Sequence, residues 1–189
     1  MQRSMVMFQV ADCCAGDIGG DGWLLVNLLT AFLAAYVVSL FEGSISRLPA
    51  LAVLMPIVAG MGGNAATQTL TVIIRGIAMN ELVGTARVTL KQSIVGLGNG
   101  LINGLVCAAV VAAFYRSIWL GMIIALAMII NMLVAGVSGS LIPVALKRMG
   151  VDPAVASSVF VTTCTDVAGF FSFLGIATLL LNLKMLVPR

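Results

Sequence analysis

Histidine is absent from this chain and charged residues are scarce, and the two absences together argue against a soluble enzyme. Histidine is the commonest protein ligand for zinc, copper and non-haem iron, and it is the base in Ser-His and Cys-His catalytic arrangements. Only 9% of the 189 residues are charged, whereas a soluble domain typically carries about 25%. Hydrophobic residues make up 61% of the chain, and its mean hydropathy is +1.15. We therefore expect an all-α integral membrane protein that is not an enzyme.

Five long apolar segments predict a single bundle of five transmembrane helices. A helix needs about 20 apolar residues to cross the hydrocarbon layer. The predicted spans cover about residues 22–42, 48–77, 91–115, 118–146 and 154–183. They leave a short N-terminal segment, 1–21, and a C-terminal tail, 184–189. The fifth span follows Asp152 and Pro153, which predict a side-chain N-cap and a proline at the first helical position.

The distribution of basic residues over the short loops predicts which side of the membrane each loop occupies. With a cytoplasmic N-terminus, the cytoplasmic side would hold Arg3, Arg75, Arg87, Lys91, Lys147 and Arg148, and the other side Arg47, Arg116, Lys184 and Arg189. Basic residues favour the cytoplasmic side, and this modest excess therefore favours that orientation. We expect a multi-pass protein of the cell's inner (plasma) membrane with a cytoplasmic N-terminus.

A single carboxylate, Asp166, lies in the middle of the fifth predicted span. A charge at the centre of a bilayer costs roughly 2.5–3.5 kcal/mol on insertion scales. Asp166 shares one stripe, at helical spacing, with Ser158, Thr162, Thr165, Gly169 and Ser172. A polar stripe at this depth must face protein or water. We expect Asp166 to serve a water-filled path, a bound cation or proton transfer. The alternative is a buried ion pair, for which Arg75 is the nearest candidate.

The second predicted span carries a cluster of glycines beside polar residues. Gly60, Gly62 and Gly63 follow Pro56, and Asn64, Thr67, Gln68 and Thr71 come directly after them. A proline followed by glycines predicts a kink or an unwound turn. Side-chain amides and freed carbonyls there could receive water or a hydrated ion, or they could form hydrogen bonds between helices. We expect most of the other glycines to serve helix packing.

The polar groups of the two spans suit a hard divalent cation. Mg²⁺ takes oxygen ligands, keeps several waters and needs only one or two carboxylates. One carboxylate per chain is little for capturing such an ion, but a symmetric homodimer would bring two copies to one axis.

Two long motifs resemble a known family. Residues 56–68, P-I-V-A-G-M-G-G-N-A-A-T-Q, with Ile74-Arg75-Gly76, resemble the second-helix signature of the MgtE family of magnesium channels. Gly150-Val-Asp-Pro-Ala154, with Thr163-Cys-Thr-Asp166-Val-Ala-Gly169, resembles the start and core of that family's fifth helix. The order, the spacing and the five-span plan also match, and the resemblance covers about residues 22–183.

The resemblance implies a homodimer in lipid with a cation pore on the dimer axis, lined by the two helices that carry these motifs. It implies that Asp166 contacts hydrated Mg²⁺, the transported ion, as the only expected metal-binding residue. The pore-lining candidates are Gly60, Gly62, Gly63, Asn64, Gln68, Ser158, Thr162, Thr165 and Gly169. We expect a Mg²⁺-selective channel that moves at least partly hydrated divalent cations into the cytoplasm and has no nucleic-acid partner.

The chain also departs from the family. Bacterial members usually carry a large cytosolic domain and a tandem CBS module that sense Mg²⁺, whereas only about 21 residues precede the first predicted span here. We expect those domains to be absent from this chain. Two other functions stay open: a proton- or sodium-coupled exchanger in which Asp166 titrates, and a membrane assembly subunit that conducts nothing. Mn²⁺, Co²⁺ and Ca²⁺ are compatible with the same oxygen ligands.

Overall fold

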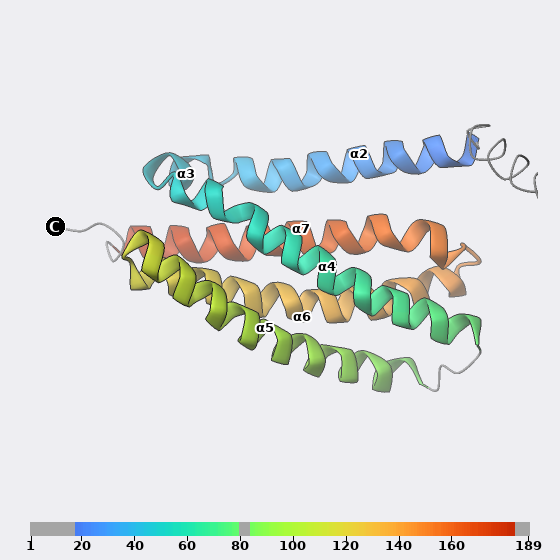
Figure 1. Ribbon diagram of the computed structural model, residues 1–189. Helices are drawn as coiled ribbons and strands as arrows, with labels where there is room; N and C mark the ends of the chain where they lie inside the picture. The colour runs from blue at the N-terminus through green and yellow to red at the C-terminus, as the bar shows by residue number, and fades with distance from the viewer. Residues whose placement is uncertain (1–17, 80–83, 184–189) are drawn as a thin grey trace, which may run out of the picture.

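The computed structural model describes residues 18–79 and 84–183, and this part of the chain is helical with no strand (Figure 1). Its helices are α2 (Ile18–Ser39), α3 (Glu42–Arg47), α4 (Ala50–Ala78), α5 (Thr85–Tyr115), α6 (Ile118–Arg148) and α7 (Pro153–Asn182). The five long helices alternate in direction, and the short α3 turns the chain from α2 into α4. The all-α prediction is therefore confirmed. The predicted segment up to residue 17 and the tail 184–189, with Arg3, Lys184 and Arg189, lie outside the described residues.

Four helices of the described part are long and apolar enough to cross a membrane. They are α4, α5, α6 and, within α7, Ala156–Asn182. Helix α2 occupies the position of the first predicted span, but the apolar stretch found in it, Leu24–Ser39, is shorter. These four helices support a multi-pass membrane protein, and the count of five spans stays a prediction.

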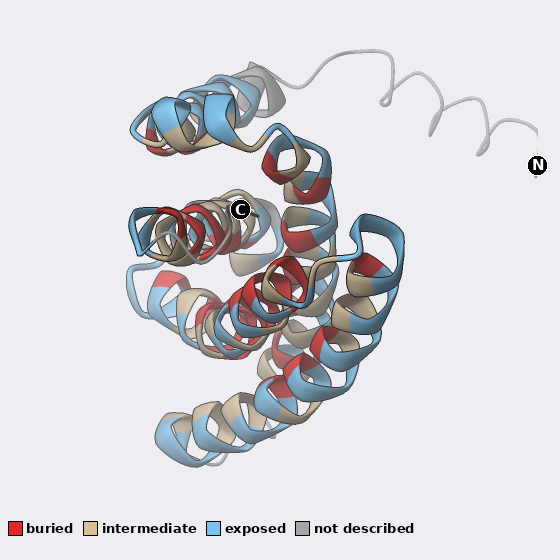
Figure 2. Cartoon of the chain, turned by 90° about the vertical axis from the view of Figure 1, so that its left-hand side faces the viewer, coloured by how far each residue is buried: buried red, intermediate tan, exposed pale blue. Residues whose placement is uncertain are grey.

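Helix α6 forms the centre of the bundle, and α4, α5 and α7 pack around it. The main core joins Val58 of α4, Met128 of α6 and Phe173 of α7, all of which are fully buried. Figure 2 shows the buried residues gathered on the inner faces of the helices, whereas α2 is exposed over most of its surface. The exposed side chains of α2 are largely apolar, as a surface in contact with lipid requires.

Three glycines spaced four residues apart bring α5 against α6. A Cβ added at Gly96 would lie 2.5 Å from the carbonyl oxygen of Met132, and one added at Gly100 would lie 2.9 Å from the Cα of Ile129. A Cβ added at Gly104 would lie 3.0 Å from the carbonyl oxygen of Ala125 in α6. In lipid, helices associate by close backbone packing of this kind. The predicted packing role of the glycines is confirmed at these positions.

The connection between α6 and α7 follows the sequence prediction. The Asp152 side chain accepts a hydrogen bond of 2.9 Å from the backbone N–H of Ala154, and Pro153 is the first residue of α7. Gly150 has a φ of +76°, a backbone conformation that glycine adopts at no steric cost. The cap and turn therefore end one span and start the next within a few residues.

The unwound turn predicted as one possibility in the second span is absent. Helix α4 runs unbroken through residues 60–64, with Pro56 inside it, so the glycine cluster forms no unwound turn. An unwound backbone in lipid leaves N–H and C=O groups without partners, and a continuous helix satisfies them. Helix α5 begins at Thr85, so the helix extends six residues beyond the start of the predicted span, whose membrane bounds stay a prediction.

Candidate functional site

Asp166 lies near the middle of α7, where its side chain is half-buried. Among residues 18–79 and 84–183, no hydrogen bond or ion pair reaches its carboxylate. Arg75, the base considered as a partner, belongs to the last turn of α4 and is exposed. The described structure therefore leaves the carboxylate without a protein counter-charge at membrane depth.

The predicted polar stripe of α7 is divided between two environments. Thr165 and Gly169 are buried, whereas Ser158 is exposed and Thr162 is half-buried like Asp166. The hydroxyl of Thr162 donates to the Ser158 carbonyl oxygen at 2.9 Å, and that of Thr165 donates to the Thr162 carbonyl oxygen at 2.9 Å. Their own helix thus uses both hydroxyl hydrogens, and only the half-buried Thr162 keeps an oxygen that water can reach.

Helix α4 presents a polar outer face at the same depth. Gly60, Asn64, Thr67, Gln68 and Thr71 are exposed on it, and the opposite face packs into the core. The hydroxyls of Thr67 and Thr71 donate back to carbonyl oxygens one turn earlier, each at 2.8 Å. The amides of Asn64 and Gln68 have no such partner among the described residues. A polar face of this kind in a membrane requires water or more protein against it.

Asn131, which lies between these helices, was not among the predicted site residues. It belongs to α6 and is fully buried, and its Nδ2 donates to the Val58 carbonyl oxygen of α4 at 2.8 Å. A Cβ added at Gly62 would overlap this amide, and one added at Gly169 would lie 2.7 Å from Nδ2. Asn131 therefore fills the space that a glycine of α4 and a glycine of α7 leave open.

The environment of Asn131 also changes how two predicted pore-lining residues are understood. Gly62 and Gly169 are buried against the Asn131 amide, so in this structure both pack helices together, unlike Gly60 and Gly63, which have no atom near their Cβ positions. The Oδ1 atom of Asn131 is buried and has no hydrogen-bond partner within the described part of the chain. An amide inside the most apolar helix was the available signal for this residue, because polar groups at that depth usually have a role.

The donor set of the described residues suits an ion that keeps its water. They contain no group of three or more His, Cys, Asp or Glu side chains that could hold a metal ion directly. What the middle of α4 and α7 offers is one carboxylate, several hydroxyl oxygens and the two amides of Asn64 and Gln68. Mg²⁺ is commonly bound through one or two carboxylates while it retains several waters, so these groups match a hydrated cation.

Comparisons with known proteins agree with the two motifs. The family model MgtE, described as a divalent cation transporter, matches residues 55–176, which include both the α4 glycines and Asp166. Proteins named magnesium transporter MgtE are 31% identical over 158 residues (Bacillus subtilis), 34% identical over 162 residues (Enterococcus faecalis) and 32% identical over 162 residues (Thermus thermophilus). These matches cover 82%, 85% and 85% of this chain, but 35%, 36% and 36% of the relatives. The chain therefore spans about a third of the length of the curated relatives that it matches.

Proposed function

The chain belongs to the MgtE family of divalent cation transporters, and from this premise we propose that it moves Mg²⁺ into the cytoplasm through a pore in which Asp166 contacts the hydrated ion. The observation that carries the proposal is the position of Asp166, a carboxylate at membrane depth with no counter-charge among the described residues. A water-filled path with a passing cation offsets the cost of that charge, which is roughly 2.5–3.5 kcal/mol in lipid.

The chemistry of the site favours contact through the water shell of the ion. Mg²⁺ dehydrates reluctantly, and a single carboxylate cannot replace six waters. An Asp166 oxygen accepting hydrogen bonds from bound waters attracts the dication without stripping it. Hydroxyl and amide oxygens, such as those of Thr162 and Asn64, extend the polar surface along the path. Weak, repeated contacts of this kind let an ion enter and leave.

The pore itself is proposed to form between two copies of the chain. Among the described residues of one copy, the polar face of α4 is exposed and Asp166 is only half-buried. A two-fold axis beside α4 and α7 would cover these residues and bring two Asp166 carboxylates to one path. With α2 as a fifth span, the N-terminus of the chain would be cytoplasmic, on the side that holds Arg75 and Arg148.

The membrane potential would drive inward movement. A potential of 100 mV is worth about 2.3 kcal/mol per elementary charge, or roughly 4.6 kcal/mol for a divalent ion. A passive pore for Mg²⁺ therefore needs no coupled ion when the cytoplasm is negative. This property distinguishes the channel from the two other functions considered.

The deciding experiment is Mg²⁺ uptake into liposomes that contain the purified chain. We expect Asp166→Ala and Asp166→Asn to abolish most of the uptake, because both remove the charge that faces the ion. Asp152→Asn is the matched control, since it makes the same change in the carboxylate just before the first residue of α7 and keeps the N-cap. Unchanged uptake in both Asp166 variants would reject the role of this residue.

The same liposomes separate the alternatives. Uptake that follows an imposed pH or Na⁺ gradient at fixed Mg²⁺ would indicate a coupled exchanger. Absence of uptake by a folded parent chain, with or without a potential, would favour a non-conducting assembly subunit. A channel predicts uptake that increases with an inside-negative potential and does not depend on either gradient.

A further inference from the structure

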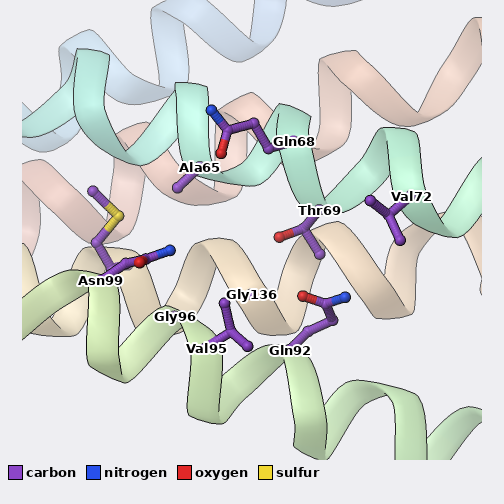
Figure 3. Close-up of a pocket in the computed structure, with 10 residues that line it drawn as sticks. Ala65, Gln68, Thr69, Val72, Gln92, Val95, Gly96, Asn99 and Gly136 are labelled. Carbon is purple, nitrogen blue, oxygen red and sulfur yellow. The ribbon is translucent and has the colours of Figure 1, made fainter.

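Two adjoining cavities lie between α4 and α5, and neither is lined by a residue of α7. The larger, of about 300 Å³, has four amide side chains in its wall, Asn64 and Gln68 of α4 with Asn99 and Asn103 of α5. The smaller, of about 150 Å³, shares Gln68 and Asn99 and adds Gln92 of α5. Figure 3 shows Gln68 on α4 and Gln92 and Asn99 on α5 across the smaller cavity. We call the two together the amide chamber.

The packing of α6 explains why the chamber exists. Helices α4 and α5 each pack extensively on α6 but hardly on each other. Helix α5 lies close to the backbone of α6 at Gly96 and Gly100. The same close approach occurs at Gly136 of α6, where an added Cβ would lie 2.5 Å from the carbonyl oxygen of Gln92. Helices α4 and α5 are therefore separated from each other, and Met132 of α6 lines the space between them. The resulting space is a consequence of the glycine contacts.

The amides of the chamber need partners that the described residues do not supply. Asn103 donates to the Asn99 carbonyl oxygen at 2.9 Å, within α5. The side chains of Asn64, Gln68 and Asn99 have no hydrogen bond with any residue of 18–79 or 84–183. These residues lie near the middle of their helices, where lipid offers no hydrogen bonds. Each amide both donates and accepts, so water satisfies all of them at once.

The size of the larger cavity fits an ion with its water. The larger cavity, of about 300 Å³, is open on the side where Asn64, Gln68 and Asn99 are exposed, and it has room for several waters, each of which occupies about 30 Å³ in the liquid. An octahedral Mg²⁺ ion carries six. Amide oxygens accept hydrogen bonds from such a shell, and because they are neutral they hold the ion weakly enough to release it.

We propose that the amide chamber is filled with water and takes a hydrated divalent cation, which its side-chain amides contact through the water shell. The chamber shares Asn64 and Gln68 with the polar face of α4 and extends that face to α5, so that Asn99 and Asn103 become cation-contacting residues. The proposal rests on the proposed function, because it requires that the chain handles such ions.

The first test is the accessibility of single cysteines to a charged, membrane-impermeant methanethiosulfonate reagent in liposomes. Cys13, Cys14, Cys107 and Cys164 are replaced by serine, and Asn99→Cys or Asn103→Cys is introduced. Leu105→Cys is the matched control, because Leu105 is an exposed apolar residue of the same helix, two residues from Asn103. We expect at least roughly tenfold faster reaction at the two chamber positions, since lipid disfavours the thiolate and the charged reagent. Two chamber positions keep the test valid if one variant fails to fold.

The second test is protection by the ion. We expect millimolar Mg²⁺ to slow the reaction at Asn99→Cys or Asn103→Cys several-fold relative to Na⁺ at equal ionic strength, and to leave Leu105→Cys unchanged. Equal, slow reaction at all three positions would show a dry chamber and overturn the proposal. Disulfide-linked dimers through Asn99→Cys would show that a second copy fills the space, with the same consequence. Fast reaction without Mg²⁺ protection would leave water alone in the chamber and reject the cation site.

Uptake measured on the same preparations separates this proposal from the proposed function. Normal Asp166-dependent Mg²⁺ uptake with no protection at Asn99→Cys rejects the chamber and leaves the pore. Protection at Asn99→Cys with no Mg²⁺ uptake by the cysteine-free parent supports the chamber as a cation site and rejects transport.

Discussion

The side-chain amide of Asn131 on α6 donates a hydrogen bond of 2.8 Å to the backbone carbonyl oxygen of Val58 on α4. The same amide occupies the space beside Gly62 and packs against Gly169 of α7. Gly169 lies one helical turn after Asp166. One buried side chain therefore sets the spacing of the two helices that carry the family motifs, although it belongs to neither.

The fit of Asn131 to Gly62 predicts a stability difference between neighbouring glycines. Gly62→Ala places a Cβ on the amide and should destabilise the fold by about 1–3 kcal/mol, as overpacking usually does. Gly63→Ala meets no atom within 4 Å and should be neutral or more stable by up to about 1 kcal/mol, because alanine favours helix. Unfolding of the purified chain in detergent measures both changes.

The same fit predicts a coupling between two substitutions. In Gly62→Ala/Asn131→Ala the clash is absent, so the double variant should be more stable than the sum of the two single changes by about 0.5 kcal/mol or more. Additive effects in this cycle would mean that the amide does not limit the size of residue 62.

Asn131 should also affect transport without contacting the ion. We expect Asn131→Ala to lower Mg²⁺ uptake several-fold, because the hydrogen bond to Val58 is lost and α4 is free to shift relative to α7. Ile123→Val is the matched control, since it shortens a fully buried side chain of the same helix and costs about 0.5–1.5 kcal/mol. Uptake in liposomes, normalised to folded protein, distinguishes them. Equal uptake in both variants would leave Asn131 with a role in stability alone.

The α5–α6 contact predicts a second pair of glycine variants. Gly96→Ala would press a Cβ against the Met132 carbonyl oxygen, a rigid backbone atom, and should cost about 1–3 kcal/mol. Gly98→Ala, two residues away, faces open space and should cost nothing. The measurement is again unfolding in detergent, and equal effects at both positions would contradict the packing described here.

The N-cap of α7 predicts that Asp152 stabilises the protein through its side-chain oxygen and not through its charge. Asp152→Ala removes the oxygen that accepts from Ala154 and should destabilise the protein by about 0.5–2 kcal/mol. Asp152→Asn keeps an oxygen at the same place and should change stability little, since asparagine caps as well as aspartate. A large effect of Asp152→Asn would indicate that the charge of Asp152, and not its cap, stabilises α7.

Several features of the site were predictable because they depend on local chemistry. The N-cap of Asp152, the long apolar helices and the mid-helix position of Asp166 follow from residue types at short spacing. Most glycines were expected to pack helices, and in α5 the contacts of Gly96, Gly100 and Gly104 confirm it, whereas Gly98 faces open space. The prediction of an unwound turn in α4 was wrong because local glycine content does not show which neighbouring helix packs against these glycines. Gly62 packs on Asn131, 69 positions away in sequence, and the helix stays intact.

The sequence by itself determined that this is an all-α membrane protein with glycines and amides in one long helix and a carboxylate in another, because lipid leaves few places for polar residues. Only the tertiary structure decided which of these groups meet. In the tertiary structure, Gly62 and Gly169 lie buried against Asn131, Asp166 has no counter-charge among the described residues, and a cavity lies beside Asn64 and Gln68 towards α5. The physical reason is that helix packing depends on which backbones can approach closely, and that is a property of pairs of helices that no single helix encodes.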